Sequence, residues 1–382
     1  MTAERQAAAA VPVAVLLGGP AAEHDVSIVS GHAIADALEG LGHPVQRIVI
    51  DLAGGWWWLP LGHRRDGRTT AAYDDPSALD AEGPLTAGAA IDRLAAEGRA
   101  TAGRSPVVVF IALHGPFGED GTVQALLESA GLAYTGSGVA ASAIGMDKAV
   151  FKRLIRGLGL PVMDWREIGI GRWTAEPDAV VAELEAFASA NGDPRLMVKP
   201  AGLGSSVGMT LAHEPGERAA ALDTAFRYDT VVLAERYLAG ARDLEVSVIG
   251  NERLDLYGPG EIVSGREFYD YAAKYTPGLS ESGMRADVPA ALRATILKYA
   301  RDSYRAIGAA GFARVDFLLA GDTLVVSEIN TIPGFTPISL FPTLPAESGL
   351  DFAAVCERVL GLAIERHATR RAATLTTADL PR

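Results

Sequence analysis

The chain has 382 residues, of which 49% are hydrophobic, a formal net charge of −13 and one cysteine, Cys356. The acidic balance argues against a nucleic-acid-binding protein, which needs a basic face, and a single cysteine excludes an internal disulfide framework. The length predicts two or three domains. No stretch reaches the roughly 18–20 apolar residues of a membrane helix, so we expect a cytoplasmic protein without a membrane partner.

The first elements predict a parallel α/β domain. Residues 11–17 have the pattern of a buried strand, and a turn follows at residues 18–20. Apolar positions then recur at helical spacing over residues 27–41, and a second strand is predicted over residues 45–50. A strand, a glycine turn, a helix and a strand in this order are typical of a parallel sheet. We interpret the apolar start as a strand after a frayed tail, and not as a signal peptide.

The segment from about 52 to 105 is predicted to be a variable insertion. It is rich in Gly, Ala, Asp and Arg and has few long apolar runs, with one helix expected near residues 89–97. The three tryptophans at 56–58 are expected to pack as core or to cover a strand edge. The insertion has no functional interpretation.

Regular structure is predicted again beyond the insertion, with a polar, disordered end over the last fifteen residues. Glycine 321 and aspartate 322 predict a tight turn between the last two strands. The predicted strands cover residues 107–113, 196–199, 231–235, 244–249, 313–319 and 323–329, and the predicted helices cover residues 122–130, 146–158 and 289–307.

Charged side chains gather on one face of the last two predicted strands. Arg314 and Asp316 share a face because side chains alternate along a strand, and so do Glu328 and Asn330. Two carboxylates and a carboxamide are oxygen ligands that suit Mg²⁺, and an adjacent arginine can stabilise a phosphoryl or oxyanion charge. A charged solvent face of an edge hairpin is the alternative, and the shaped turn at Pro333-Gly334 favours the metal site.

Residues 204–208 match G-x-S-x-G, the nucleophile elbow of serine hydrolases, with Ser206 as the nucleophile. Asp316 and then His367 follow in the order of a catalytic triad. Against this hypothesis, His367 lies in a charged C-terminal helix, which is a poor place for a triad base. It also leaves the charged hairpin unexplained.

The same glycine loop is alternatively a lid over phosphates. Lys199 ends a predicted strand just before it, and backbone N–H groups with the hydroxyls of Ser205 and Ser206 can then wrap a γ-phosphate. Lys148, at a predicted helix start, is a second candidate phosphate ligand. A single such lysine is more often solvated, but two before glycine loops favour the lid. The Walker motif is absent.

With these motifs in order, the chain resembles the D-alanine–D-alanine ligases of the ATP-grasp superfamily over most of its length outside the insertion and tails. The resemblance rests on GGPAAEHDVS (18–27), HGPFGEDG (114–121), YTGSG (134–138), MDK (146–148), KPAGLGSSVG (199–208), FYDYAAKY (268–275), RVD (314–316) and EINTIPGFTPISL (328–340). It implies an α/β ATP-grasp fold. The implied parts are a Rossmann-like N-terminal domain (1–136), a central lid domain (137–235), a C-terminal catalytic domain (236–370) and a disordered tail (371–382).

The resemblance also implies a reaction. ATP phosphorylates the carboxylate of one D-alanine, and the amine of a second D-alanine attacks the acyl phosphate, which yields D-alanyl-D-alanine for peptidoglycan precursors. The implied ligands of Mg²⁺ (two ions, with Mn²⁺ as a substitute) are Asp316, Glu328 and Asn330. The implied phosphate ligands are Lys148, Lys199, Ser206 and Lys274, and the implied oxyanion site is Arg314 with the backbone N–H of Gly334.

Further roles follow from the resemblance alone. Glu23 pairs with the ammonium of the first D-alanine, and His114 assists positioning or proton transfer there. The alternatives without a function are a solvated glutamate and a histidine that packs in the core. Ser205 and Tyr275 link to Glu23 and close the lid. Ser339, with Leu340 beside it, binds the carboxylate of the second D-alanine. The implied nucleotide contacts are Glu235 and Leu238 at the adenine and Glu245 at the ribose.

Several alternatives remain open at this stage. A tyrosine at 275 favours D-alanine over D-lactate as second substrate, but D-alanine–D-lactate and D-alanine–D-serine ligases share the fold. A non-catalytic amino-acid sensor would tolerate loss of Asp316 and Glu328. A dehydrogenase is disfavoured because G-x-G-x-x-G is absent at Gly18. Ala272 stands where many relatives carry an acid, which concerns lid dynamics. The resemblance implies a homodimer.

Overall fold

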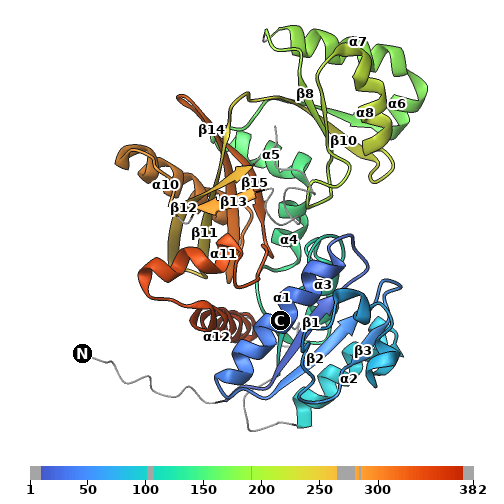
Figure 1. Ribbon diagram of the computed structural model, residues 1–382, viewed down its shortest axis with the longest axis vertical. Coiled ribbons are helices and arrows are strands. Elements are labelled where there is room, and N and C mark those ends of the chain that lie inside the picture. The colour runs from blue at the N-terminus through green and yellow to red at the C-terminus, as the bar shows by residue number, and fades with distance from the viewer. Residues whose placement is uncertain (1–9, 101–106, 191, 265–279, 284, 373–382) are drawn as a thin grey trace, which may run out of the picture.

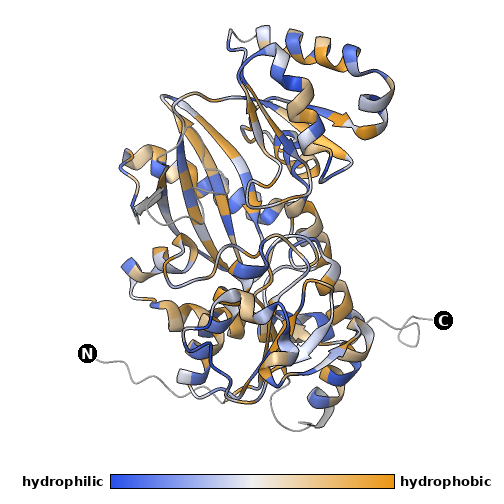
Figure 2. Ribbon diagram, turned by 45° about the vertical axis from the view of Figure 1, so that its right-hand side comes forward, coloured by the Kyte–Doolittle hydropathy of each residue, from blue (hydrophilic) through white to orange (hydrophobic). Residues whose placement is uncertain are grey.

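The computed structural model describes residues 10–100, 107–190, 192–264, 280–283 and 285–372, arranged around three sheets (Figure 1). The first sheet lies at the bottom of the view, the third in the middle and the second at the top. Hydrophobic residues recur along the strands and on the helix faces that cover them (Figure 2). Among the described residues, none of the helices is long and apolar enough to cross a membrane.

The first sheet confirms the predicted parallel start. Strand β1 pairs in parallel with β2 and β5, and β5 with β6. Its strand order is β4-β3-β2-β1-β5-β6, with β1 (Val13–Gly18), β2 (Val45–Ile50), β3 (Trp56–Trp58), β4 (Glu82–Leu85), β5 (Val108–Ile111) and β6 (Ala133–Tyr134). Its helices are α1 (His24–Gly40), α2 (Ala87–Ala100) and α3 (Thr122–Ser129).

The predicted insertion is more ordered than its composition indicated. It adds two antiparallel edge strands to the sheet, because β3 pairs with β2 and β4 with β3. The tryptophans thus form a strand, with Trp56 fully buried and Trp58 nearly so. Two short 3-10 helices, η1 (Thr70–Tyr73) and η2 (Pro76–Leu79), and helix α2 complete the segment.

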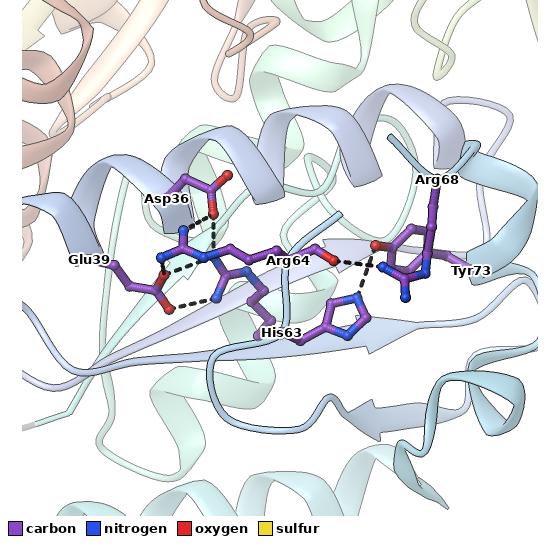
Figure 3. Close-up of polar contacts among 7 residues, drawn as sticks. Asp36, Glu39, His63, Arg64, Arg68 and Tyr73 are labelled. Carbon is purple, nitrogen blue, oxygen red and sulfur yellow. Dashed lines mark hydrogen bonds and ion pairs between the residues drawn. The ribbon is translucent and has the colours of Figure 1, made fainter. Parts of the chain in front are cut away.

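A network of charges ties this insertion to α1 (Figure 3). The buried Arg47 of β2 reaches Asp36 at 2.5 Å and Glu39 at 2.6 Å. Arg64 of the insertion pairs with the same two carboxylates, at 2.5 and 2.7 Å. The two arginines therefore share both carboxylates. The guanidinium of Arg47 thus has the charged partners that a buried charge requires.

The buried ring of His32, near Arg47 of this network, predicts a pH-dependent stability. The ring lies 4.9 Å from that of Tyr73, and neither nitrogen has a hydrogen-bond partner among the described residues. Burial, reinforced by the nearby Arg47 and His63, lowers the pKa of His32 from 6.5 to about 3. Between these values the unfolded chain binds a proton that the folded chain excludes, so the free energy of unfolding falls as pH falls.

We therefore expect His32→Phe to flatten the acid side of the stability profile. Phenylalanine keeps the ring contact and removes the titrating group, so the variant should be spared roughly 2 kcal/mol of the loss between pH 8 and pH 5. Urea unfolding of both proteins at the two pH values measures the difference. Equal losses in the two proteins would show that His32 is not the group responsible.

The second sheet is antiparallel, with the order β7-β10-β8-β9. Its core contains the buried faces of two helices, including Val180 and Leu222. The strands are β7 (Trp165–Gly169), β8 (Leu196–Pro200), β9 (Thr210–Ala212) and β10 (Val231–Arg236), and the helices are α6 (Ile170–Ala175), α7 (Pro177–Ser189) and α8 (Arg218–Ala225), the last preceded by η3 (Pro215–Glu217).

Two helices, not one, precede the second sheet. The helix predicted over residues 146–158 is confirmed as α5 (Lys148–Gly157), whereas the separate helix α4 (Val139–Met146) just before it was not predicted. Asp147 between them has an extended backbone, and its carboxylate accepts hydrogen bonds from the N–H groups of Ala149 and Val150. An aspartate N-cap of this kind starts a new helix.

The third sheet has the order β13-β12-β11-β14-β15 and carries the predicted charged hairpin. Strands β14 and β15 are antiparallel and join through the predicted turn at Gly321-Asp322. The elements are β11 (Arg242–Gly250), β12 (Leu254–Ser264), β13 (Ser280–Gly283), α10 (Ala290–Ala306), β14 (Phe312–Ala320), β15 (Thr323–Asn330), α11 (Leu340–Thr343), η4 (Leu344–Ser348) and α12 (Phe352–Ala372).

An aromatic core joins the third sheet to the first. Phe335, which follows β15, lies 5.8 Å from Phe110 of β5 and 5.7 Å from Phe312 of β14, ring centroid to centroid. Helix α12 packs into the same core and remains helical to Ala372, so the predicted disordered end is wrong for residues 368–372, and the tail domain starting at 371 is wrong for residues 371 and 372. A 21-residue helix packed on α1 outweighs the polar composition of its end. The rest of the predicted tail lies outside the described residues.

Candidate active site

A cleft lies between the second and third sheets, with about 1190 Å³ of empty space when the open solvent at its mouth is included. Its walls come from β8 and β10 on one side and from β11, β14 and β15 on the other. The cleft gathers many of the residues predicted from the sequence: Lys148, Lys199, Ser205, Ser206, Glu235, Leu238, Glu245, Arg314, Asp316 and Glu328.

The charged hairpin forms one wall of this cleft. Asp316 faces Glu328 across the two strands, and Arg314 faces Asn330. Both guanidinium contacts of Arg314 with Asp316 are 2.7 Å, and Asn330 Nδ2 donates to Asp316 Oδ2 at 2.9 Å. The predicted polar surface is thus confirmed, and it faces a cleft, so the alternative of a plain solvent face is not supported.

Arg314 is charged and firmly held. Its Nε lies 3.3 Å from Glu245 Oε2, so two carboxylates share it. Burial alone would lower its pKa, but Asp316 and Glu245 outweigh that effect and raise the pKa well above its usual value. A permanently charged, bidentate donor at this place is suited to an anionic group in the cleft.

The donor set of the hairpin fits a divalent cation that also binds phosphate. Among the described residues, no three His, Cys, Asp or Glu side chains stand close enough to hold a metal by themselves. Asp316 and Glu328 offer two carboxylates, and turning the amide of Asn330 would present its oxygen. One or two carboxylates supplemented by phosphate oxygens is the environment that Mg²⁺ prefers.

Two lysines line the cleft, Lys148 and Lys199. Lys148 Nζ donates to the carbonyl of Leu203 at 2.6 Å and lies 3.3 Å from Glu328 Oε2, so it connects the glycine loop with the hairpin. Lys199 Nζ lies 2.8 Å from Glu235 Oε1. Burial would raise the pKa of Glu235, but Lys152 and Lys199 together lower it.

Lys152 is a residue that the sequence analysis missed. Its Nζ lies 3.1 Å from Glu235 Oε1, and the side chain is almost completely buried. Burial lowers its pKa to about 8, against the opposing effect of Glu235. Its position one helical turn after Lys148 places both lysines on one face of α5, a signal that was legible in the sequence.

The glycine loop reaches from the second sheet to the first. Ser205 and Ser206 adopt left-handed backbone conformations, with φ of 48° and 59°, a geometry in which successive N–H groups can converge on an anion. A Cβ added at Gly204 would lie 2.9 Å from Glu23 Oε1. This close backbone approach places the loop directly over Glu23.

The serine-hydrolase hypothesis does not fit this loop. A nucleophile elbow joins a strand to a helix, whereas residues 201–209 join β8 to the antiparallel strand β9. The proposed base His367 is on α12, where it lines a different hollow together with Leu132 and Arg371. Ser206 therefore has neither the backbone context nor the base that the hypothesis requires.

The remaining predicted residues lie where the first and third sheets meet. Glu23 is buried at the N-terminus of α1, and His114 follows β5. Gly334 and Ser339 are neighbours, since a Cβ on Gly334 would lie 3.3 Å from Ser339 Oγ. Leu340 packs in a small core with Ile262 and Leu344, and its place beside Ser339 at the second D-alanine stays a prediction. Lys274 and Tyr275 lie outside the described residues.

Comparisons with known proteins agree over most of the chain. Residues 12–137 match the family model described as D-ala D-ala ligase N-terminus, and residues 154–361 match D-ala D-ala ligase C-terminus. A D-alanine--D-alanine ligase of Heliobacterium modesticaldum is 38% identical over 97% of this chain and 98% of its own length. One of Kineococcus radiotolerans is 40% identical over 93% of this chain and 96% of its own length.

Solved structures agree as well. The D-alanine-D-alanine ligase from Coxiella burnetii has a TM-score of 0.73 at 29% identity, covering 94% of this chain and 97% of its own. The VanG D-Ala:D-Ser ligase from Enterococcus faecalis has a TM-score of 0.76 at 28% identity, covering 93% and 99%. These matches confirm the predicted α/β ATP-grasp fold. The chain therefore belongs to the D-alanine–D-alanine ligase family.

Proposed function

We propose that the protein joins two D-alanines to D-alanyl-D-alanine at the expense of ATP, through an acyl-phosphate intermediate, for peptidoglycan precursor synthesis. The observation that carries the proposal is the cleft between the second and third sheets, where Lys148 and Lys199 line the same space as the hairpin carboxylates Asp316 and Glu328. That charge arrangement suits a triphosphate with its cation. D-alanine is proposed as the amino-acid substrate because the relatives are named D-alanine--D-alanine ligases.

The cleft residues have distinct roles in this proposal. Lys148, Lys199 and the Ser205–Ser206 loop hold the phosphates, and the backbone around Glu235 and Leu238 binds the adenine, with Glu245 at the ribose. Asp316, Glu328 and Asn330 hold Mg²⁺, which neutralises charge on the phosphates when bound. Two ions are proposed, with Mn²⁺ able to replace them. Lys274 is proposed as a further phosphate ligand.

The amino acids bind where the cleft meets the first sheet. The carboxylate of Glu23, at the N-terminus of α1, forms an ion pair with the ammonium of the first D-alanine. Arg314 and the N–H of Gly334 stabilise the oxyanion that forms when the second amine attacks. Ser339 holds the second carboxylate, and the loop over Glu23, with Tyr275, excludes water from the acyl phosphate.

A second candidate reaction differs only in the nucleophile. The structural match to a D-Ala:D-Ser ligase favours D-serine as an alternative second substrate, and D-lactate is the other member of this group. We further propose that the protein works in the cytoplasm, where ATP and the peptidoglycan precursors are found. It is also proposed to be a homodimer, with domains at 1–136, 137–235 and 236–370.

The reaction is tested by phosphate release from ATP and Mg²⁺ with D-alanine alone, with D-alanine plus D-serine, and with D-alanine plus D-lactate, each product being identified by mass. We expect D-alanine alone to support turnover and to give D-alanyl-D-alanine. Product only in a mixed pair would keep the chemistry and replace the second substrate. No turnover with any pair would refute the ligase and leave an amino-acid sensor.

A further inference from the structure

Ile332, two residues before Gly334 of the proposed oxyanion site, is held by hydrogen bonds to both its backbone carbonyl and its backbone N–H. The carbonyl of Ile332 lies 3.0 Å from His114 Nδ1, and the N–H of Ile332 lies 3.4 Å from Glu119 Oε2. Both partners come from the loop that follows β5 in the first sheet. Ile332 itself lies between β15 and Gly334, on the side of the third sheet.

The ring of His114 has no nitrogen left for a substrate. A carbonyl only accepts, so the contact with Ile332 requires a proton on Nδ1. Nε2 lies 3.1 Å from the hydroxyl of the buried Ser30 of α1 and then accepts a hydrogen bond from it. Burial, despite the opposing contact with the Ile332 carbonyl, lowers the pKa of His114 to about 4, which keeps the ring neutral. Both nitrogens are thus committed to the protein.

Glu119 connects the two halves of the amino-acid site. Its Oε1 accepts a hydrogen bond of 2.9 Å from the N–H of Gly115. A Cβ on Gly115 would clash with the carboxylate of Glu23, the proposed ammonium ligand. The same carboxyl group therefore touches the loop under Glu23 with one oxygen and the segment that leads to Gly334 with the other.

We propose that Ser30, His114 and Glu119 form a clamp on Ile332 that positions the Gly334 N–H against the loop under Glu23. In this arrangement His114 neither binds substrate nor transfers a proton, and Glu119 is a positioning residue. The inference rests on the proposed ligase reaction for its effect on rate. The clamp itself is a property of the folded protein without substrate. A few tenths of an ångström at an oxyanion donor matter because such donors act by preorganised geometry.

Two variants at one position separate the clamp from a role in binding or proton transfer. The amide nitrogen of His114→Asn can occupy the place of Nδ1 and donate to Ile332, whereas that of His114→Gln extends toward the place of Nε2. We expect His114→Asn to keep kcat within about threefold and His114→Gln to lower it about tenfold, the scale of one buried hydrogen bond. The KM for D-alanine should change less than about twofold in both.

Glu119→Gln supplies an independent measurement. The amide keeps an acceptor for Gly115 but turns N–H groups toward the N–H of Ile332, so we expect kcat to fall about tenfold with KM unchanged. A raised KM for D-alanine at unchanged kcat, in any of these variants, would make the residue a substrate ligand. A loss beyond about a thousandfold in both His114 variants would make the ring a proton-transfer group.

Amide hydrogen exchange without substrate tests the clamp apart from the reaction. We expect the Ile332 amide to exchange faster in His114→Gln and in Glu119→Gln than in the wild type, with His114→Asn close to the wild type. Unchanged exchange in all variants would refute the clamp, whatever the activity. If the wild type makes no dipeptide, the proposed reaction fails and the exchange result still decides the clamp. Should the His114 variants not fold, Glu119→Gln decides it.

Discussion

Glu328→Gln is expected to lower kcat for D-alanyl-D-alanine synthesis by at least about a hundredfold, more than the loss of a residue that only supports a metal ligand. Glu328 is one of two carboxylates that the hairpin presents to the cleft, and it lies 3.3 Å from Lys148 Nζ. Glutamine keeps the shape but removes the charge that the cation and the lysine share. Phosphate release at a series of Mg²⁺ concentrations measures both the rate and the metal requirement.

The matched control is Asp322→Asn, which removes the same charge from the exposed turn of the same hairpin. It should leave kcat within about twofold, because an exposed charge away from the site is screened. Wild-type turnover by Glu328→Gln at saturating Mg²⁺ would overturn the assignment of this residue to the metal. A large loss in both variants would point to the hairpin's net charge instead.

The strands and the turn of the charged hairpin were predictable because their signals are local. Strand alternation alone places Arg314 and Asp316 on one face, and a Gly-Asp turn fixes that the next strand returns beside it. A regular two-residue turn would pair Asp316 with Ser327. The structure pairs Asp316 with Glu328 because a β-bulge at Ser327 shifts the register, and no local pattern in the sequence signals that bulge. Helix α1 and the parallel start of the first sheet were predictable for the same reason, since periodicity and a glycine turn lie within a few residues of each other.

What the sequence did not predict depends on contacts between distant segments. Ile332 meets His114 and Glu119 across more than two hundred residues, and no local pattern signals such a meeting. The insertion looked irregular because Ala, Gly and Arg dilute its pattern, yet β3 gains order from pairing with β2 and from burying Trp56. The packing of Leu340 against Ile262 and Leu344 likewise depends on segments that are distant in the sequence.

Arg314→Lys is expected to lower kcat about a hundredfold or more, on the scale of losing one oxyanion donor. The guanidinium holds both oxygens of Asp316 at 2.7 Å and Glu245 at 3.3 Å, so its remaining N–H directions toward the cleft are fixed. A lysine keeps the charge but not the planar fork, so neither Asp316 nor the oxyanion keeps its geometry. Steady-state rates with saturating ATP and D-alanine measure the loss.

Arg242→Lys provides a matched control on the neighbouring strand. Arg242 makes the same bidentate contact with Glu261, at 2.7 Å to each oxygen, and does not line the cleft. Both substitutions exchange a fork for a point charge, so both should cost a similar amount of folding free energy, about 1 kcal/mol. Only Arg314→Lys should lose kcat, because only there does the fork face the reacting groups.

Arg314→Met separates charge from geometry. It leaves Asp316 and Glu245 without their shared partner, which for a largely buried pair costs about 3 kcal/mol of folding free energy. If Arg314→Lys kept wild-type kcat while Arg314→Met lost both stability and rate, Arg314 would serve only to hold Asp316 in place. The oxyanion would then depend on the Gly334 N–H alone, and Glu119→Gln should lower kcat more than Arg314→Lys does.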